Sequence, residues 1–217
     1  MVVIGIVGSP AGGKSTVAQH LRELGATWID ADRIARRCLR LSEVRRRLAA
    51  QFGRDVLDAR GQIDRPVLAD RVFGDDAASR QGLDYLESVV HPPARELAVR
   101  RMRRAARQRS LAAVLDAPML LEADWGVMCD AIWCVEAPQH LRLDWIAERG
   151  WSVQELQRRE RRQMDIQQKR RLSTHLLMND GDRGELRRQT QMHWSALMQA
   201  LEVRSMHPLL LAPGHCI

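Results

Sequence analysis

Short apolar runs alternate with amphipathic helical patterns at the start of the chain. Residues 2–7, Val-Val-Ile-Gly-Ile-Val, form the β-branched run that is typical of a buried parallel strand. Apolar residues then recur at helical spacing at Val17, Leu21 and Leu24. A second strand pattern follows over residues 27–32 and ends in acidic residues. This order of elements predicts an α/β fold around a parallel sheet.

Three further strand patterns lie in the second half of the chain. They cover residues 112–118, 130–135 and 175–179, and the first of them carries an acid, Asp116, near its end. A closing helix is expected over residues 183–203. Its expected inward positions are Leu186, Met192, Leu197 and Leu201.

Residues 33–110 carry helical patterns in place of strand patterns. The apolar spacing predicts one helix over residues 33–50, a loop over residues 52–65 and another helix that begins at Pro66. This region therefore forms a helical insertion between the second and the third strand.

Two prolines divide the end of this insertion. A helix is expected over residues 79–90, and His91-Pro92-Pro93 is expected to break it, because a proline disfavours helical geometry in the residue before it. A long basic helix is expected to begin at Pro93. Most of its arginines are expected on a solvated face: Arg95, Arg100, Arg101, Arg103, Arg104, Arg107 and Arg109.

The segment between the first strand and the first helix carries a specific motif. Residues 8–15, Gly-Ser-Pro-Ala-Gly-Gly-Lys-Ser, fit the phosphate-binding loop (P-loop) pattern G-x-x-x-x-G-K-S/T at every fixed position. Glycines allow backbone N–H groups to approach phosphate oxygens, and the N-terminus of the following helix adds free donors. The residues expected to bind the nucleotide are Gly8, Ala11, Gly12, Gly13, Lys14, Ser15 and Thr16.

The chemistry of this loop assigns roles to three polar side chains. Lys14 is placed to reach the β- and γ-phosphates of ATP, and the Ser15 hydroxyl is placed to ligate Mg²⁺. Asp116 resembles a Walker B carboxylate that would help to hold the same ion, directly or through water. The alternative is a glycine-rich turn that binds nothing. It is disfavoured because the strand, the loop and the helix all agree with the motif.

Asp30 and Asp32 fall at the carboxyl end of the second strand, the edge at which open parallel sheets bind ligands. A carboxylate beside a P-loop is able to accept the proton of an attacking hydroxyl. Asp is also a favoured helix N-cap, so the sequence leaves a catalytic and a capping role open for Asp32. For His91, a core or capping role is favoured over a functional one.

The composition of the 217-residue chain is that of a globular protein, with 45% hydrophobic and 28% charged residues. No apolar run is long enough to span a bilayer, and the apolar N-terminus reads as a core strand rather than a signal peptide. The four cysteines lack metal or redox spacing and are expected to be buried thiols of a cytoplasmic protein. A formal net charge of +7 favours an anionic partner, either a nucleic acid or a phosphorylated small molecule.

Arginines crowd residues 139–172, after the fourth strand. Two helical patterns join there at Gly150-Trp151-Ser152, and Ser152 with Glu155 forms a capping box. Nucleotide kinases carry a mobile lid at this place, and its arginines neutralise charge on the transferring phosphoryl group. We interpret residues 139–172 as such a lid, in which several arginines are expected to be solvated surface only.

The sequence resembles the dephospho-coenzyme A (dephospho-CoA) kinases from about residue 3 to residue 190, and the resemblance is carried by more than the P-loop. The segments that carry the resemblance are Asp30-Ala31-Asp32, Ile34-Ala35-Arg36, Phe52-Gly53, Gly61, Ile63-Asp64-Arg65, Leu68, Phe73, His91-Pro92, Pro118-Met119-Leu120-Leu121-Glu122, Arg159, Gln163, Lys169 and Asn179-Asp180-Gly181. Pro10-Ala11 and Ser173-Thr174 depart from the usual pattern of the family.

The resemblance implies ATP-dependent phosphorylation of the ribose 3′-hydroxyl of dephospho-CoA with Mg²⁺, which gives CoA and ADP in the last step of CoA biosynthesis. The catalytic residues that it implies are Asp32 as the base, Lys14, and the lid arginines Arg142 and Arg149. The implied acceptor-binding residues are Asp32, Arg65, His91, Pro118 and Glu122. A small anionic acceptor accounts for the positive charge, so no nucleic-acid or membrane partner is expected. The oligomeric state stays open.

The fold class expected is a P-loop three-layer α/β sandwich with a five-stranded parallel sheet in the order 2-3-1-4-5. A helical acceptor-binding insertion and a helical lid complete it. The expected divisions are a P-loop core of residues 1–32, 111–138 and 173–205, an insertion of residues 33–110, a lid of residues 139–172 and a C-terminal tail of residues 206–217.

Two other functions remain open on the sequence alone. One is a P-loop kinase of another small acceptor, such as a nucleoside monophosphate or shikimate, which the insertion pattern at residues 52–73 disfavours. The other is a basic, ATP-regulated nucleic-acid-binding module, supported by the arginine-rich helices at residues 95–109 and 158–171. An aromatic content of 4%, without a stretch of interleaved aromatic residues, disfavours this module.

Overall fold

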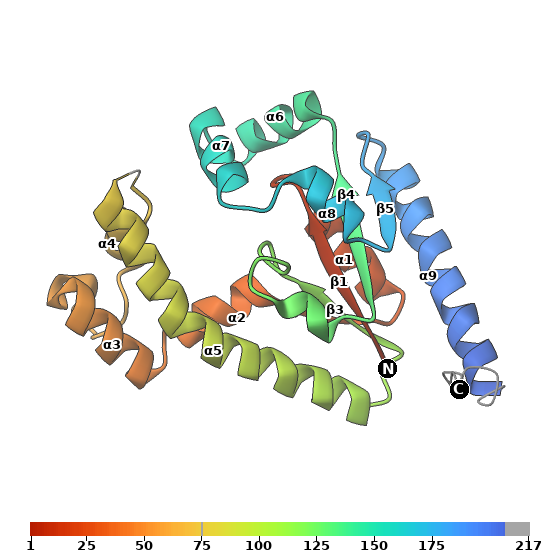
Figure 1. The fold of residues 1–217 in the computed structure, drawn as a ribbon, viewed down its shortest axis with the longest axis horizontal. Coiled ribbons are helices and arrows are strands. Elements are labelled where there is room, and N and C mark those ends of the chain that lie inside the picture. The colour runs from red at the N-terminus through yellow and green to blue at the C-terminus, as the bar shows by residue number, and fades with distance from the viewer. Residues whose placement is uncertain (75, 207–217) are drawn as a thin grey trace, which may run out of the picture. The chain divides into compact units, whose positions relative to one another are not determined.

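The computed structural model describes residues 1–74 and 76–206, so the expected C-terminal tail of residues 206–217 lies outside the described residues apart from its first residue. The chain divides into two compact units (Figure 1). One comprises Met1–Trp28 and Ser110–Ile217, and the other comprises Ile29–Arg109.

A five-stranded parallel sheet in the order β2-β3-β1-β4-β5 forms the framework, which confirms the predicted order. Its strands are β1 (Val2–Gly8), β2 (Thr27–Asp30), β3 (Ala112–Asp116), β4 (Ala131–Glu136) and β5 (His175–Met178). The central strand β1 pairs with β3, with Ile6 opposite Asp116, and with β4, with Gly8 opposite Val135. Because carboxyl ends of parallel strands meet at one edge, the segment after β1 and the end of β3 share that edge.

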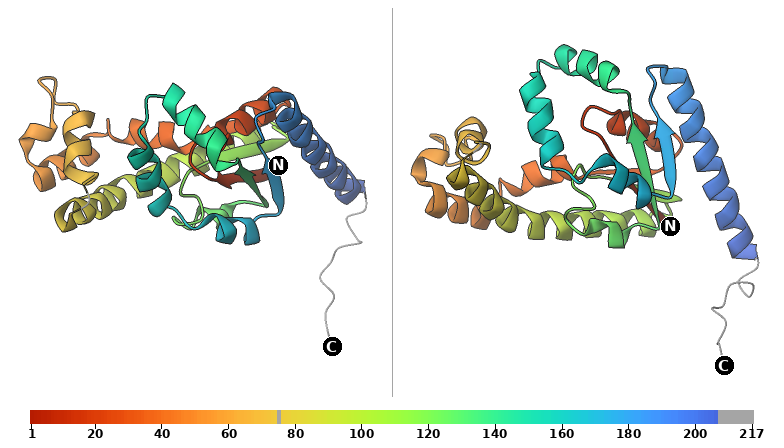
Figure 2. Two further views of the ribbon diagram at one scale, coloured as in Figure 1. Left: turned by 90° about the horizontal axis from the view of Figure 1, so that it is seen from above. Right: turned by 45° about the horizontal axis from the view of Figure 1, so that its top comes forward.

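Two helices cover one face of this sheet. α1 (Lys14–Glu23) packs with Val17 and Leu21, and α9 (Arg183–Met206) runs beside β5 (Figure 2). Both helices join the strands in one apolar cluster, in which Val17, Leu21 and Leu186 are at most 1% exposed. The apolar spacing seen in the sequence therefore corresponds to real burial for α1.

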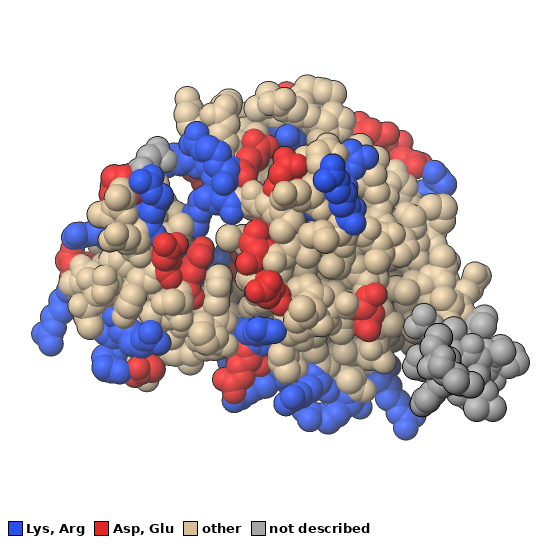
Figure 3. All heavy atoms as spheres, in the orientation of Figure 1, with Lys and Arg blue, Asp and Glu red and all other residues tan. Residues whose placement is uncertain are grey.

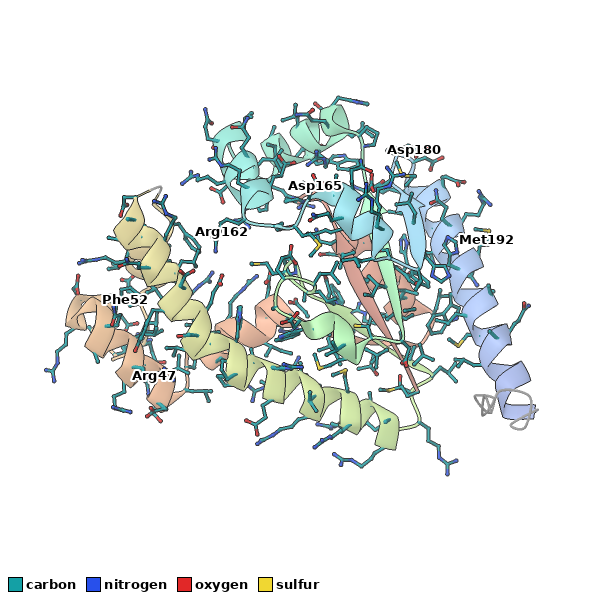
Figure 4. The ribbon with its side chains drawn as sticks, in the orientation of Figure 1. Arg47, Phe52, Arg162, Asp165, Asp180 and Met192 are labelled. Atoms are coloured by element: carbon teal, nitrogen blue, oxygen red, sulfur yellow. The ribbon has the colours of Figure 1, made fainter. Side chains whose placement is uncertain are left out.

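The predicted inward face of α9 is correct except at one position. Leu186 and Trp194 are buried, and Leu197 and Leu201 are partly buried against the same cluster. Met192 is 51% exposed and points away from the unit (Figure 4), so its expected inward orientation is wrong. At about 100° per residue, position 192 falls on the opposite side of the helix from the other four.

The expected lid contains three helices, α6 (Gln139–Glu148), α7 (Val153–Arg161) and α8 (Ile166–Arg171). The predicted joint between the first two is confirmed, since Gly150 has a φ of 70° and the Ser152 hydroxyl accepts the Glu155 N–H at 3.1 Å. The sequence did not separate the third helix. It begins at its own cap, where Asp165 (Figure 4) accepts the N–H of Gln167 at 2.8 Å.

The second unit is helical. It contains α2 (Ala31–Cys38), α3 (Ser42–Phe52), α4 (Arg65–Val72) and α5 (Ala77–Arg107), with a short 3-10 turn, η1 (Arg54–Val56). Each of α2, α3 and α4 packs on α5, and the Phe52 and Tyr85 rings meet edge to face at 6.0 Å. The single helix expected over residues 33–50 is wrong, because Leu41 is extended, with a ψ of 134°, and separates α2 from α3.

α5 runs through His91-Pro92-Pro93 without a break, so the helix boundary expected there is wrong. A proline removes one backbone hydrogen bond from a helix interior. Burial on both sides of the prolines, at Val90, Ala94 and Ala98, offsets that loss. The arginines of the C-terminal half of α5 are exposed, with one half-buried exception, and lie along the lower edge of Figure 3. The predicted solvated face is therefore confirmed.

The described cysteines are free thiols, as expected. Cys38 and Cys134 are buried, Cys129 is half-buried, and Cys216 lies outside the described residues. Burial raises the pKa of Cys129 to about 12 and that of Cys134 to about 11. In the described part of the chain, no helix combines the length and the apolar character that crossing a bilayer would require.

Candidate active site

The P-loop turns from β1 into α1 through three residues with positive φ. These are Gly8 at 141°, Ala11 at 59° and Gly13 at 101°. A Cβ atom at Gly8 would lie 2.0 Å from the carbonyl oxygen of Val135, so only glycine fits there. α1 begins directly after Gly13, which brings its first N–H groups to the loop.

Lys14 opens α1 and is 9% exposed. Its Nζ donates to the carbonyl of Gly8 at 3.1 Å and to that of Ser9 at 2.8 Å. These two bonds hold the ammonium group against the loop. Ser15 is exposed and Thr16 is half-buried in the same helical turn. The predicted nucleotide-binding residues are therefore brought together in one loop and one helix start.

Asn179 supports this loop from the other end of the sequence. It follows β5, is 7% exposed, and donates from Nδ2 to the Gly12 carbonyl at 3.2 Å. A Cβ atom at Gly13 would lie 2.4 Å from that nitrogen, so the glycine makes room for the amide. Sequence reasoning gave Asn179 no role of its own. Its position directly after the last strand, at the carboxyl edge of the sheet, is the signal that could have identified it.

Asp116 ends β3 and is 8% exposed. Its strand pairing places it beside Ile6, two residues before the P-loop begins at Gly8. Among the described residues, no three or more His, Cys, Asp or Glu side chains form a metal-binding group. The Ser15 hydroxyl and the Asp116 carboxylate are hard oxygen donors. They suit Mg²⁺, which takes one or two protein ligands and completes its shell with phosphate and water.

The first two helices of the expected lid, α6 and α7, rest on the P-loop through a small apolar cluster. Ala11, 8% exposed, packs against Ile146 of α6 and Leu156 of α7, which are both 2% exposed. Leu143 and Trp151 are partly buried against the same group. Burying a Leu or Ile side chain contributes about 1.5–3 kcal/mol, so this contact fastens two lid helices to the nucleotide-binding loop.

Arg142 adds a polar link between the lid and the loop. Its Nη1 donates to the Pro10 carbonyl at 3.5 Å and pairs with Glu160 of α7. The side chain is 11% exposed, and its Nε is buried without a hydrogen-bond partner among the described residues. A buried guanidinium N–H of this kind suits an anion such as phosphate. Arg149, by contrast, is exposed, with its guanidinium 6.0 Å from the centre of the Trp151 ring.

Glu122 lies in the segment that follows β3. Its Oε1 accepts the N–H of Met164 at 2.6 Å and lies 3.2 Å from the Nζ of Lys169. Its Oε2 is buried and has no hydrogen-bond partner among the described residues. Pro118, half-buried, precedes it in the same segment. Part of the Glu122 carboxylate is thus engaged with the lid, a relationship that the sequence did not indicate.

Three predicted site residues belong to the helical unit. Asp32 is exposed in the first turn of α2, whose N-cap is Asp30, which accepts the N–H of Arg33 at 2.8 Å. Arg65 is exposed as the first residue of α4, and His91 is half-buried in α5. The capping role that the sequence left open for Asp32 therefore belongs to its neighbour.

The comparison with protein families decides between the alternatives. The family model for dephospho-CoA kinase matches residues 2–185. The chain belongs to the dephospho-CoA kinase family. The dephospho-CoA kinase of Rhodopirellula baltica is 38% identical over 198 residues, which cover 91% of this chain and 92% of that protein.

Solved structures show the same fold. A protein from Thermus thermophilus is 33% identical with a TM-score of 0.74, and the match covers 90% of this chain and 97% of that one. A dephospho-CoA kinase from Campylobacter jejuni matches in fold, with 22% identity and a TM-score of 0.62 over 90% of this chain and 96% of that one. The predicted P-loop kinase fold is confirmed.

Proposed function

We propose that this chain transfers the γ-phosphoryl group of ATP to the ribose 3′-hydroxyl of dephospho-CoA and so forms CoA and ADP, the last step of CoA biosynthesis. The observation that carries the proposal is the family match over residues 2–185, on a chain whose P-loop is complete and folded around Lys14. Phosphoryl transfer depends mostly on positioning and on stabilising negative charge, and these are what a P-loop and a basic lid supply.

Lys14 and Arg142 are proposed to stabilise the transferring phosphoryl group. Lys14 is held against the loop by its contacts with the carbonyls of Gly8 and Ser9, and it opens the helix whose N-terminus attracts anions. The support for Arg142 is its contact with Pro10 of the P-loop. Arg149 is proposed as a second lid arginine on the family resemblance alone.

Asp32 is proposed as the base that orients the acceptor hydroxyl and takes its proton. The support is its exposure in the first turn of α2, two residues after the end of β2, together with the capping role of Asp30. A carboxylate in this role typically contributes about 10²–10⁴ in rate.

The acceptor is proposed to contact Arg65 and His91 in the helical unit, together with Pro118 and Glu122. Arg65 is exposed and is thus accessible to a pyrophosphate-bearing acceptor. The division into a core of residues 1–32, 111–138 and 173–205, an insertion of residues 33–110 and a lid of residues 139–172 is proposed to separate nucleotide binding, acceptor binding and closure.

Ser15 and Asp116 are proposed to hold Mg²⁺, whose donor preferences they match. When bound, the ion would neutralise phosphate charge in the transition state. We further propose a cytoplasmic location, because a reducing compartment keeps cysteines such as Cys38 and Cys134 as thiols. The partners proposed are ATP and the small-molecule acceptor.

A comparison of acceptors tests the proposed function. ADP release is measured with ATP and Mg²⁺ in the presence of dephospho-CoA, a nucleoside monophosphate or shikimate. We expect kcat/KM to be at least ~10³ higher for dephospho-CoA than for the other acceptors, because a site built for a substrate's polar groups strongly rejects compounds that lack them. Equal or higher turnover with another acceptor would contradict the proposal.

A further inference from the structure

Lys169 of α8 is buried more completely than any other charged residue in residues 1–74 and 76–201, with 1% of its side chain exposed. Removing an ammonium group from water costs several kcal/mol unless close partners compensate it. The family resemblance included Lys169 in a pattern, but neither the P-loop nor the proposed chemistry uses its charge. Because burying this ammonium group is costly in free energy, we expect its partners to indicate a role for Lys169.

The partners of Lys169 join two distant parts of the chain. Its Nζ donates to the Gln163 Oε1 at 2.8 Å and lies 3.2 Å from the Glu122 Oε1. The same carboxylate oxygen accepts the N–H of Met164 at 2.6 Å. One oxygen atom thus binds both the backbone that leaves α7 and the ammonium group of α8. We call Glu122, Gln163, Met164 and Lys169 the lid anchor.

The segment that carries Glu122 is itself held in place by hydrogen bonds and packing. The backbone around Glu122 is closed by hydrogen bonds from Ala123 N to Met119 O at 3.0 Å and from Trp125 N to Leu120 O at 2.8 Å. Leu120 is fully buried, and a Cβ atom added at Gly5 of the central strand would lie 3.0 Å from it. The segment that carries Glu122 is therefore packed against the central strand of the sheet.

The lid anchor fixes one end of α7. Gln163 and Met164 lie two and three residues after the end of this helix, whose Leu156 packs on Ala11 and whose Glu160 pairs with Arg142. The position of α7 therefore determines where Leu156 contacts the P-loop and where Glu160 pairs with Arg142 of α6. If this end of α7 were not held, the whole helix could shift. Small displacements of a charge-stabilising group reduce the rate of phosphoryl transfer strongly.

We propose that Lys169 and Glu122 are positioning residues that hold the C-terminal end of α7, so that α7 and its partner Arg142 keep one fixed position relative to the transferring phosphoryl group. This rests on the proposed kinase function. Neither side chain needs to touch ATP for this role. Loss of one charge leaves the other buried and uncompensated, whereas removal of both leaves a neutral contact of similar size.

The test compares Lys169→Met, Glu122→Gln and the double variant with the wild type. Arg171→Gln is the matched control, because it removes one positive charge from an exposed position on the same helix. We expect each single variant to lower kcat at least ~10-fold and the double variant to recover most of that loss. The KM for dephospho-CoA should change little in Lys169→Met, whereas Glu122→Gln should also raise it, because Glu122 is proposed to contact the acceptor. Arg171→Gln is expected to stay within ~2-fold of the wild type.

Two readouts separate positioning from a general loss of stability. The first is the ratio of ADP to CoA formed, which should rise in the single variants because a loosened lid admits water. The second is trypsin cleavage at Arg158–Arg162 without substrates, which should be at least ~10-fold faster in the single variants and close to wild type in the double variant. If Lys169→Met does not fold, Glu122→Gln still removes one charge while keeping an acceptor oxygen for Met164.

The outcomes distinguish the two proposals. No CoA formation by the wild type would end the proposed function, and the positioning role with it, whatever the trypsin result. Wild-type CoA formation together with unchanged kcat, ADP-to-CoA ratio and cleavage in Lys169→Met and Glu122→Gln would overturn the anchor alone. A double variant that is as impaired as the worse single variant would also overturn it.

Discussion

Asn179 donates its side-chain amide to the Gly12 carbonyl at 3.2 Å, across 167 positions of sequence. This bond ties the residue after the outermost strand to the loop after the central one. It is buried, and the adjacent Gly13 leaves the space that the amide occupies. The shape of the nucleotide-binding backbone therefore depends on a residue far outside the P-loop motif.

Asn179→Ala is expected to weaken ATP binding and to lower stability. Loss of a buried hydrogen bond leaves the Gly12 carbonyl without this donor, at a cost of about 1–3 kcal/mol. We expect a higher KM for ATP, an unchanged KM for dephospho-CoA, and a lower free energy of unfolding in urea. The control is Asp180→Asn, a change at the exposed neighbour (Figure 4). Equal ATP affinity in Asn179→Ala and the wild type would contradict this role.

Lys14→Ala is expected to reduce kcat by about 10²–10⁴, because the ammonium group is proposed to offset charge that develops in the transition state. Lys14→Arg is the companion variant, since it keeps the charge but not the compact shape that reaches Gly8 and Ser9. Single-turnover rates measured with saturating ATP separate chemistry from binding. A single-turnover rate for Lys14→Ala within a factor of three of wild type would rule out this assignment.

Leu156→Ala is expected to loosen the lid from the P-loop. Truncating a core leucine costs about 2–5 kcal/mol, which is comparable to the whole contribution of the cluster around Ala11. The KM for ATP should rise, and so should trypsin cleavage between α6 and α7. Val153→Ala, on the same helix with 48% of the residue exposed, is the matched control. Similar cleavage rates in both variants would show that the cluster does not hold the lid.

The thiols are expected to resist alkylation in the folded protein. Burial raises the pKa of Cys129 to about 12 and that of Cys134 to about 11, and it raises the pKa of Cys38 as well. At pH 8 these groups are therefore almost entirely neutral. In a Cys216→Ser variant, iodoacetamide should label the native protein at least ~10²-fold more slowly than the urea-unfolded protein. Equal labelling rates would contradict the burial of the thiols.

The same pKa shifts fix the direction of a stability change. Above a pH of about 9 the thiols of the unfolded chain lose protons while Cys129 and Cys134 in the folded chain keep theirs. The unfolded state then binds fewer protons, so the free energy of unfolding should fall as the pH rises from about 9 toward 12. Replacing Cys134 by Ala should make that fall shallower.

The local features of the fold could be predicted from the sequence, because short-range physics determines them. The P-loop follows from glycines between a β-branched run and an amphipathic helix. The joint at Gly150 and Ser152 follows from a positive-φ glycine and a cap. The carboxyl-edge position of Asp116 follows from a strand that ends in an acid. In each case the determining residues are close together in the sequence.

The errors arose where tertiary contacts overrode local signals. Pro92 and Pro93 indicated a helix end, but burial of residues on both sides keeps α5 continuous. The lid anchor could not be predicted for a related reason, because a lysine in an arginine-rich segment suggests a solvated surface and nothing in the sequence links it to Glu122. Only the fold shows that Lys169 is 1% exposed and that its partner lies 47 residues earlier, at Glu122.

The position of the transferred phosphate tests the central claim most directly. Purified protein is incubated with Mg²⁺, dephospho-CoA and ATP labelled at the γ-phosphate. The product is then treated with a 3′-nucleotidase, a phosphatase that removes only 3′-phosphates. The account predicts a labelled product that co-migrates with CoA and loses its label on this treatment, with Asp32→Asn forming it at least ~10²-fold more slowly. Label that survives the treatment, or an Asp32→Asn variant as fast as the wild type, would contradict it.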